Sequence, residues 1–486
     1  MYLLVILYIY FVSFLDKPEK SAPALSPRAI EQRAKWHIPT DEMDYPVCAA
    51  YLDSLRARDI KIHHTSRWFN GATVEMDVAK VAEVESLSFV TAVELTRDES
   101  GSLFSQRKRA ISIQHSAIAH HQSSINVRYT DQQLALYNLT PLHDLGYEGQ
   151  GILMTVCDGG FTNANTMECF RQTQELGHFD FTDDIDDFYG NTGDHGSECL
   201  SAISGIQDGY YGAATKADYY LMRSEEYATE SPKEMDNLVA ALEKADSLGV
   251  NVFSFSGGYT QFDNPIWDLN KWNDLDGKTT RVSRAATIAA RKGMLVCVAA
   301  GNEGDVAWRT ISVPADADSI LTVGAVRTDS VAADFSSYGP SSDGRIKPEV
   351  CAVGVQSVLI NPFSNAIERS NGTSFATPLL AGMAASLWSA LPDKNAMQIR
   401  DLIIQSAHLY PSYDPNNQMG YGIPDAWQAY TMGLGEDTNN LTPAIAPEEG
   451  VKMLIDGQIY ILRGGKRYDL LGKELGHYGS MIISLL

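Results

Sequence analysis

The sequence predicts an α/β fold in which a largely parallel sheet is covered by helices on both faces. Three short runs at 152–157, 217–222 and 250–255 are apolar at nearly every position, as in strands buried on both faces. Segments with helical periodicity separate these runs throughout residues 134–432. Strands that alternate with helices are typical of parallel sheets, whose functional sites lie beyond the carboxyl ends of the strands.

Residues 1–97 are predicted to form a small, separate α+β unit. The apolar run at 2–15 is shorter than the roughly 20 residues of a membrane-spanning helix. It has no Lys or Arg before it, as a signal peptide would, so we favour a β-strand over a signal-peptide core. On that interpretation the chain lacks its true start. The Ser-Pro pair at 26–27 predicts the beginning of a helix.

Two linkers divide the rest of the chain. Residues 98–133 are polar, with a basic run and few large apolar side chains, and predict an exposed linker of the kind that proteases cut. The α/β domain follows at 134–432, and a second linker at 433–449. Residues 450–486 are predicted to form a short β segment, because Asp-Gly and Gly-Gly pairs separate its alternating stretches.

Composition excludes several classes of function. The formal net charge of −23 disfavours nucleic acid as a partner, since phosphate binding relies on clustered Lys and Arg. The six cysteines have no C-x-x-C spacing, which argues against a zinc ribbon or a thioredoxin-like site, and we expect buried free thiols. No apolar run is long enough to predict a membrane span.

Three segments each carry a reactive side chain at the end of a strand or the start of a helix. Asp158 directly follows the apolar run at 152–157, and His195 lies between small residues just before a helical run. Ser374 begins a long helix, where the dipole and the free N–H groups stabilise negative charge. Each residue alone has an ordinary interpretation: an Asp in a turn, a His in a loop, a Ser that caps a helix.

A fourth segment, Ala-Gly-Asn ending at Asn302, also follows a buried strand, and its amide can donate to an oxyanion. Together the four segments, in the order Asp, His, Asn, Ser, resemble the subtilase family of serine proteases. The order of the triad residues separates this family from chymotrypsins and from α/β-hydrolases, and the serine segment is not G-x-S-x-G. The resemblance covers about residues 134–430.

This resemblance implies a subtilisin-like fold and a serine endopeptidase that cuts protein or peptide substrates through an acyl-enzyme. Ser374 would attack the scissile carbonyl, His195 would act as general base and then acid, and Asp158 would orient His195. Asn302 and the Ser374 N–H would bind the oxyanion. The substrate-binding residues implied by the family are Ser256, Gly257, Gly258, Ala299, Ala300 and Gly301.

The N-terminal unit resembles a subtilase propeptide, in particular at 66–72, a segment similar to that in Bacteroidetes-type subtilases. This implies a zymogen whose own N-terminal propeptide is a partner, with the cut somewhere in 98–130. It also implies a secreted, cell-envelope or periplasmic protein. The β tail resembles C-terminal segments of secreted proteins from the same bacteria.

The chain departs from the family at Gly159, where Ser or Thr is usual, so we expect a loosened Asp158 carboxylate. The family implies no required cofactor, and we expect no metal site. The acidic stretch at 180–187 is a calcium candidate, but its spacing is not that of an EF-hand loop and favours a solvated loop.

Two other functions compete with catalysis. A non-catalytic binding protein would keep the subtilase fold and lose turnover, but all four functional positions are intact. A nucleotide-binding α/β protein needs a glycine-rich phosphate loop after a strand, and Asp158-Gly159-Gly160 is not G-x-G-x-x-G. We therefore predict an active endopeptidase.

Overall fold

The computed structural model describes residues 7–18, 21–98, 116–117, 128–182, 187–226, 229–412 and 418–435, and four strands of the C-terminal segment. The chain divides into two compact units, Met1–Leu434 and Gly435–Leu486. Among the described residues, no helix is long and apolar enough to cross a membrane.

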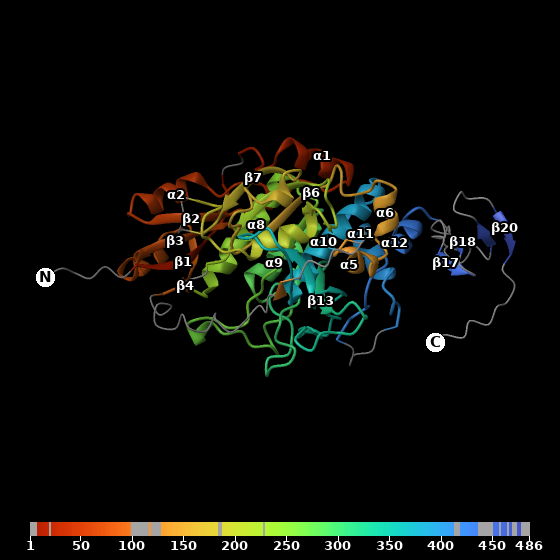
Figure 1. The fold of residues 1–486 in the computed structure, drawn as a ribbon. Helices are drawn as coiled ribbons and strands as arrows, with labels where there is room; N and C mark the ends of the chain where they lie inside the picture. Colours follow the sequence, from red (N-terminus) through yellow and green to blue (C-terminus); the bar gives the residue numbers. More distant parts are fainter. Residues whose placement is uncertain are drawn as a thin grey trace. The chain divides into compact units, whose positions relative to one another are not determined.

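The larger unit contains a seven-stranded sheet whose neighbouring strands all run parallel, which confirms the predicted fold class (Figure 1). The first strand of this sheet in the sequence lies in its interior. The next two strands along the chain lie on one side of it, and the remaining four lie on the other side. Such a reversal is where parallel sheets bind ligands. In spatial order the strands are β14 (Val350–Val353), β13 (Leu321–Val326), β12 (Leu295–Ala299), β11 (Val252–Phe255), β6 (Leu153–Asp158), β10 (Asp218–Arg223) and β7 (Gln174–Asp180).

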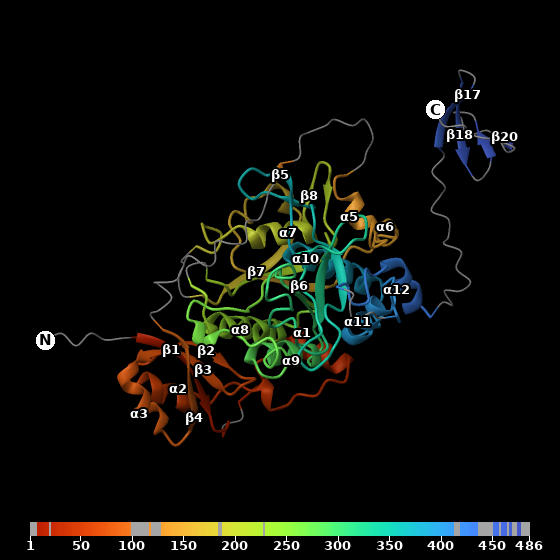
Figure 2. The same cartoon turned by 90° about the horizontal axis from the view of Figure 1, so that it is seen from below.

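Two hydrophobic cores cover the two faces of this sheet. In β12, Leu295 and Cys297 pack into one core, and Val296 and Val298 into the other, because side chains alternate along a strand. Helices α7 (His195–Ser204) and α10 (Thr373–Ala390) supply the first core, and α8 (Pro232–Leu248) and α9 (Arg281–Arg291) the second (Figures 1 and 2). Burial on both faces explains why these strands are apolar throughout.

The N-terminal unit, residues 7–98, is a four-stranded antiparallel sheet with helices, as predicted. Its strands are ordered β2 (Lys61–Ser66), β3 (Gly71–Asp77), β1 (Leu7–Phe14) and β4 (Val90–Arg97), and its helices are α1 (Pro27–Lys35), α2 (Ala49–Arg56) and α3 (Val81–Glu85). β1 occupies most of the predicted apolar run. Tyr10, Val12 and Phe14 pack into the unit's own core, whereas the Arg281 guanidinium lies over the ring of Phe11, 3.8 Å from its centroid.

Buried ion pairs join the N-terminal unit to α8 and α9. Asp246 of α8 accepts hydrogen bonds from the Arg33 guanidinium at 2.7 and 2.8 Å, and it also pairs with Arg67. Lys292, directly after α9, pairs with Asp41 at 2.7 Å and with Asp44 at 3.1 Å. Burial raises the pKa of Asp44, but the Arg33 ion pair and the Asp41 N–H more than offset this and hold it below its ordinary value.

Helix α5 (Asp131–Ala135) begins within the range 98–133 of the predicted linker. Leu134 of this helix packs in the first core, and the buried Gln133 side chain bonds the Val358 backbone. Within the same range, β5 (Ser116–Ala117) pairs with β16 (Ile367–Ser370), which forms a hairpin with β15 (Ser357–Ile360). Residues 99–115 and 118–127 lie outside the described residues.

Three helices complete the larger unit: α6 (Thr140–Asp144), α11 (Ala396–Gln405) and α12 (Ala426–Gly433). A short hairpin pairs β8 (Ile206–Gln207) with β9 (Tyr210–Tyr211). The C-terminal segment, taken by itself, is an antiparallel meander of β17 (Val451–Ile455), β18 (Gln458–Arg463), β19 (Lys466–Tyr468) and β20 (Glu474–His477). The predicted Asp-Gly and Gly-Gly turn pairs, at 456–457 and 464–465, lie outside the described residues.

Candidate active site

Three neighbouring strands end at the residues singled out by the sequence. β6 ends at Asp158, β11 is followed by Ser256–Gly258, and β12 leads into Ala299–Asn302. β11 lies between β6 and β12 in the sheet. These side chains therefore share one edge of the sheet, at the carboxyl ends of parallel strands.

Asp158 and His195 are in direct contact. His195 Nδ1 lies 2.9 Å from Asp158 Oδ1 and 3.0 Å from Oδ2, and Asp158 is buried. The Gly159 N–H donates to Asp158 Oδ1 at 2.7 Å. Arg223, also buried, donates from Nε to the Gly159 carbonyl at 2.9 Å. The turn that lacks the usual Ser or Thr is thus held by backbone and arginine hydrogen bonds.

His195 is the first residue of α7, and Gly196 brings that helix against the Asp158 turn. A Cβ on Gly196 would lie 2.4 Å from the Gly160 carbonyl oxygen and 2.9 Å from Asp158 Cβ, so only glycine fits. Burial lowers the pKa of His195, but the Asp158 carboxylate outweighs burial and raises it well above its ordinary value. The imidazolium is therefore stabilised by its partner.

Ser374 lies in the first turn of α10 and is mostly buried, with 8% of its surface exposed. Gly372, at φ 157°, precedes the helix, and a Cβ there would lie 2.7 Å from Ser374 Oγ. Cys199 connects the two sides of the site: its thiol donates to the Ser374 carbonyl at 3.4 Å and lies 3.8 Å from His195 Nδ1. The structure thus brings His195 and Ser374 to the same thiol.

Cys199 is not itself placed to act as a nucleophile. Burial raises the pKa of its thiol to about 11, so it is protonated at neutral pH, and the thiolate is the reactive form. Asp158, His195 and Cys199 could together offer three metal ligands. However, His195 Nδ1, the nitrogen nearest the thiol, is already bonded to Asp158. All six cysteines, each within the described residues, are unpaired and buried, as expected.

Asn302 has a fixed orientation. Its side chain accepts hydrogen bonds from the Thr373 N–H at 2.9 Å and from the Thr373 hydroxyl at 3.0 Å. A backbone N–H can only donate, so the accepting atom must be the amide oxygen. The amide NH₂ of Asn302 then points away from Thr373, and no described group holds it by a hydrogen bond that would compete with a ligand.

The six residues expected to bind substrate end or directly follow the neighbouring strands β11 and β12. Gly258 packs so closely on Ser312 that a Cβ would fall 2.1 Å from its hydroxyl, and Gly301 has φ 110°, which favours glycine. Ala300 is tied into the sheet by its N–H, which donates to Val323, and by its carbonyl, which accepts from Ser312. The Ser256 hydroxyl is buried, and its partner is the Cys199 thiol.

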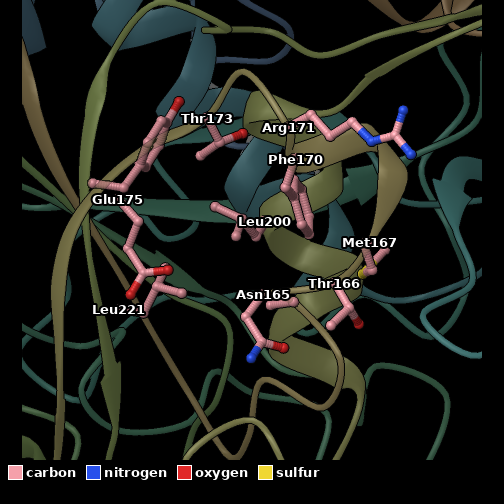
Figure 3. A pocket seen from close by; sticks show the side chains of 11 residues that line it. Asn165, Thr166, Met167, Phe170, Arg171, Thr173, Glu175, Leu200 and Leu221 are labelled. Carbon is pink, nitrogen blue, oxygen red and sulfur yellow. The ribbon is translucent and has the colours of Figure 1, made fainter.

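The acidic stretch at 180–187 is only partly described. Asp180 forms an ion pair with Arg223 at 3.1 Å and accepts from the Thr182 N–H, and Asp187 accepts from the Tyr189 N–H. Residues 183–186 lie outside the described residues. A separate cavity of about 380 Å³ lies between the loop at 164–173, β7, β10 and α7, and none of Asp158, His195 and Ser374 lines it (Figure 3).

Sequence reasoning missed Glu198, one turn after His195 on α7. Glu198 and Glu368 of β16 are both buried, and their carboxyl groups are hydrogen-bonded to each other. Burial, together with Asp194 and Glu368, raises the pKa of Glu198 to about 8, against the opposing effect of His195. The Asn361 amide also lies 3.2 Å from Glu368. No local signal in the sequence reveals this pair, because its members are 170 positions apart.

The raised pKa of Glu198 makes the stability of the fold depend on pH. Below about pH 4.5, the ordinary value, the carboxyl is protonated in both states. As the pH rises toward 8 only the unfolded chain ionises freely, so folding becomes costlier. We expect Glu198→Gln, made in an inactive Ser374→Ala background, to match its parent near pH 4 and to exceed it at pH 8 by on the order of 3 kcal/mol.

Thermal or urea unfolding between pH 4 and 9 checks this expectation. Glu168→Gln is a matched control, because Glu168 is exposed and pairs only at the surface with Arg171, so its difference from the parent should not vary with pH. Parallel stability curves for Glu198→Gln and its parent across this range would contradict the raised pKa of Glu198.

Comparison with known proteins agrees with the geometry. Residues 111–422 match the model of the subtilase family, peptidase S8, and residues 9–114 match that of the peptidase S8 propeptide domain of Bacteroidota. Subtilisin NAT of Bacillus subtilis subsp. natto is 27% identical over 335 residues, which cover 66% of this chain and 77% of that protein.

Two further relatives cover different shares. Serine protease AprX of Bacillus subtilis (strain 168) is 33% identical over 153 residues, 27% of this chain and 34% of AprX, so the match spans about a third of that protein. The solved structure of the prenylagaramide maturation protease PagA is 24% identical, with a TM-score of 0.48, over 60% of this chain and 98% of PagA. The family match over more than half of the chain identifies it: the protein belongs to the subtilase family and is a serine endopeptidase with a Bacteroidota-type propeptide domain.

Proposed function

We propose that this endopeptidase cuts peptide bonds through an acyl-enzyme on Ser374, with His195 as general base and acid and Asp158 as the orienting carboxylate. The observation that carries the proposal is the 2.9 Å contact between His195 Nδ1 and Asp158, since the Cys199 thiol that lies 3.8 Å from His195 also donates to the Ser374 carbonyl. Substrates are proteins or peptides that bind in extended form.

In the first half-reaction Ser374 Oγ forms a bond to the scissile carbonyl carbon and its proton moves to His195 Nε2. His195 then gives this proton to the leaving amine as the C–N bond breaks. In the second half, water attacks the carbonyl carbon of the ester and gives a proton to His195. His195 returns this proton to Ser374 Oγ as the bond between Oγ and the carbonyl carbon breaks and the acid leaves. Asp158 accepts the Nδ1–H throughout, which fixes the tautomer and favours the imidazolium.

The charge on the carbonyl oxygen in both tetrahedral intermediates needs donors that are already oriented. Asn302 supplies one, because Thr373 fixes its oxygen and leaves its NH₂ for the ligand. The Ser374 N–H, in the first turn of α10, supplies the other. Ser256, Gly257 and Gly258 pair with the substrate backbone, and Ala299, Ala300 and Gly301 line the pocket for the residue before the cut.

We further propose that residues 1–97 act as the propeptide of the domain at 134–432, and that the chain functions outside the cytoplasm, secreted or in the cell envelope. The family match at 9–114 and the buried ion pairs with Asp246 and Lys292 support the first point. The acidic composition and the family support the second. Catalysis requires no cofactor in this proposal, because every proton and charge has a protein partner.

The test is fluorophosphonate labelling of the purified protein beside Ser374→Ala, with casein digestion in parallel. We expect both labelling and digestion in the wild type and neither in Ser374→Ala. Ser389→Ala is a matched control at the other end of α10, where the hydroxyl bonds only the Ser386 carbonyl and the Gly149 N–H. It should label and digest like the wild type. A folded, processed wild type that takes no label would favour the non-catalytic binding protein instead.

A further inference from the structure

Helix α7 contacts the chain segment that leads to Ser374 at two points in its first two turns. One is the Cys199 thiol, a weak donor, which bonds the Ser374 carbonyl at 3.4 Å. The other is the buried carboxyl of Glu198, which is hydrogen-bonded to the buried carboxyl of Glu368 on β16. β16 ends at Ser370, four residues before Ser374, so this second contact ties α7 to the strand that leads to the nucleophile.

The hydrogen bond between the two carboxyls requires a proton, because two ionised carboxylates can only accept. The Asn361 amide shows which carboxyl holds this proton. The Asn361 side-chain oxygen accepts from the backbone N–H groups of Phe363 and Ser364 at 2.9 and 3.0 Å. Its NH₂ therefore faces Glu368 and donates to the two carboxylate oxygens at 3.3 and 3.2 Å. Glu368 is thus the acceptor, and Glu198 is the carboxylic acid that donates to it.

The charges around Glu198 favour its neutral form. Burial first, then Asp194 and Glu368, raise the pKa of Glu198 to about 8, against the opposing effect of His195. Helix α10 and strands β15 and β5, which contact α7 or β16, carry no ionisable side chain. The carboxylic acid is therefore the stable form of Glu198 in the folded enzyme at neutral pH. Other ionisable side chains on the elements around the pair are Asp158 of β6, Glu168 and Cys169 of η4 (Glu168–Phe170), Cys199 of α7, Tyr210 of β9 and Arg369 of β16.

We propose that Glu198 and Glu368 are positioning residues for the reaction. Their shared proton holds the helix of the general base against the strand that leads to the nucleophile. This inference rests on the proposed function, since it assumes that His195 takes its proton from Ser374. It goes further by assigning a buried carboxylic acid, outside the triad and the oxyanion donors, on which the alignment of the two catalytic groups depends.

The same proton sets an alkaline limit to activity. When Glu198 gives its proton to the solvent, two ionised carboxylates face each other in a buried place, and the Asn361 amide donates to Glu368. Like charges without a donor between them repel, so α7 and β16 lose their tie. Because the pKa of Glu198 is about 8, we expect kcat/KM to fall about tenfold for each unit of pH above this value, and to recover when the pH is lowered again.

The first test compares two substitutions of Glu198 at neutral pH, in the enzyme after it has processed itself. Glu198→Leu removes the hydrogen bond to Glu368, and we expect kcat on a peptide substrate to fall about tenfold while KM changes about twofold or less. Glu198→Gln keeps an NH₂ that donates to Glu368, and its kcat should match the wild type. A wild-type kcat in Glu198→Leu would overturn the proposal. If Glu198→Leu does not fold, the pH dependence of Glu198→Gln decides.

The second test follows kcat/KM of Glu198→Gln and of the wild type between about pH 5 and 10. Glutamine cannot ionise, so the tie remains at every pH. The ratio of variant to wild type should be close to one near pH 7 and about ten near pH 9, and the acid limb should not differ. Glu168→Gln is the matched control, since Glu168 is exposed and pairs with Arg171 at the surface, and its ratio should not vary with pH. A ratio for Glu198→Gln that stays constant from about pH 7 to 9 would contradict the positioning role.

The third test observes the proton without catalysis, by infrared spectroscopy of the full-length Ser374→Ala protein. Between about pH 7 and 9 we expect the absorption of a protonated carboxyl group to disappear as the pH rises. The same protein with Glu198→Gln should lack this absorption change. If the two proteins give the same spectra across this range, no proton lies between the carboxyls and the proposal is wrong.

Together the tests separate this inference from the proposed function. If none of the proteins cuts a peptide but the infrared change depends on Glu198, the assignment of Ser374 as the nucleophile fails and the shared proton stands. If the wild type and Glu198→Gln cut peptides with the same pH dependence, catalysis stands and the positioning role of the pair fails.

Discussion

An Asp158→Asn enzyme is expected to fold like the wild type and to lose about 10⁴-fold in kcat. Asparagine keeps an oxygen that can accept from the Gly159 N–H, so the turn survives. Its NH₂ then faces His195 Nδ1, which can remain only as an acceptor, and the ring proton moves to Nε2. That nitrogen can no longer take the proton of Ser374, and no carboxylate remains to stabilise the imidazolium.

Single-turnover kinetics on a peptide substrate and thermal unfolding measure the two halves of this expectation. Asp180→Asn is the matched control: Asp180 ends the strand β7 and pairs with Arg223 at 3.1 Å, yet it touches neither His195 nor Ser374. It should lose far less activity. If Asp158→Asn kept more than a tenth of the wild-type rate, the role given to the Asp158–His195 contact would be wrong.

The parallel sheet could be predicted from sequence because strands that are buried on both faces are apolar on both faces, and this composition is visible in the sequence. β6, β11 and β12 are buried at every position, so each is a short apolar run without alternation. β1 was harder to predict, since the apolar run at 2–15 is also typical of a signal-peptide core. The structure explains the pattern: Tyr10 and Val12 face the unit's own core, and Phe11 faces Arg281 of the larger domain.

Candidate site residues could be proposed from sequence where a local pattern carries them, because a reactive side chain at a strand end or a helix start needs small neighbours. Gly196 and Gly372 are such neighbours, each placed against Asp158 or Ser374. The Glu198–Glu368 pair could not be predicted in this way, since neither residue has an unusual local setting. The burial of Gln133 could not be predicted either, because the Val358 carbonyl that it bonds is remote in sequence.

The ion pairs between the N-terminal unit and α8 were likewise invisible in the sequence, and they carry the second large effect. Asp246→Ala, in the Ser374→Ala background, is expected to cost the full-length protein about 3–5 kcal/mol of stability. Asp246 is 5% exposed and pairs with both Arg33 and Arg67. Without Asp246, Arg33 still pairs with Asp44, and Arg67 still donates to the Glu243 carbonyl. Both buried guanidinium groups nevertheless lose the Asp246 carboxylate.

Urea unfolding of the full-length protein measures this cost, and Asp329→Ala is its control. The Asp329–Arg327 pair has the same 2.7 Å separation as Asp246–Arg33, but both of its side chains are more than half exposed. An exposed pair is worth about 0–1 kcal/mol, so burial is the variable that differs between the two.

Because Arg33 and Arg67 belong to the N-terminal unit, the loss of stability should appear as detachment of this unit at a lower urea concentration than in the parent. If Asp246→Ala and Asp329→Ala cost the same, the buried ion pairs do not hold this unit on α8, and its attachment depends on apolar contacts such as that of Trp68 with the core beneath α8 and α9.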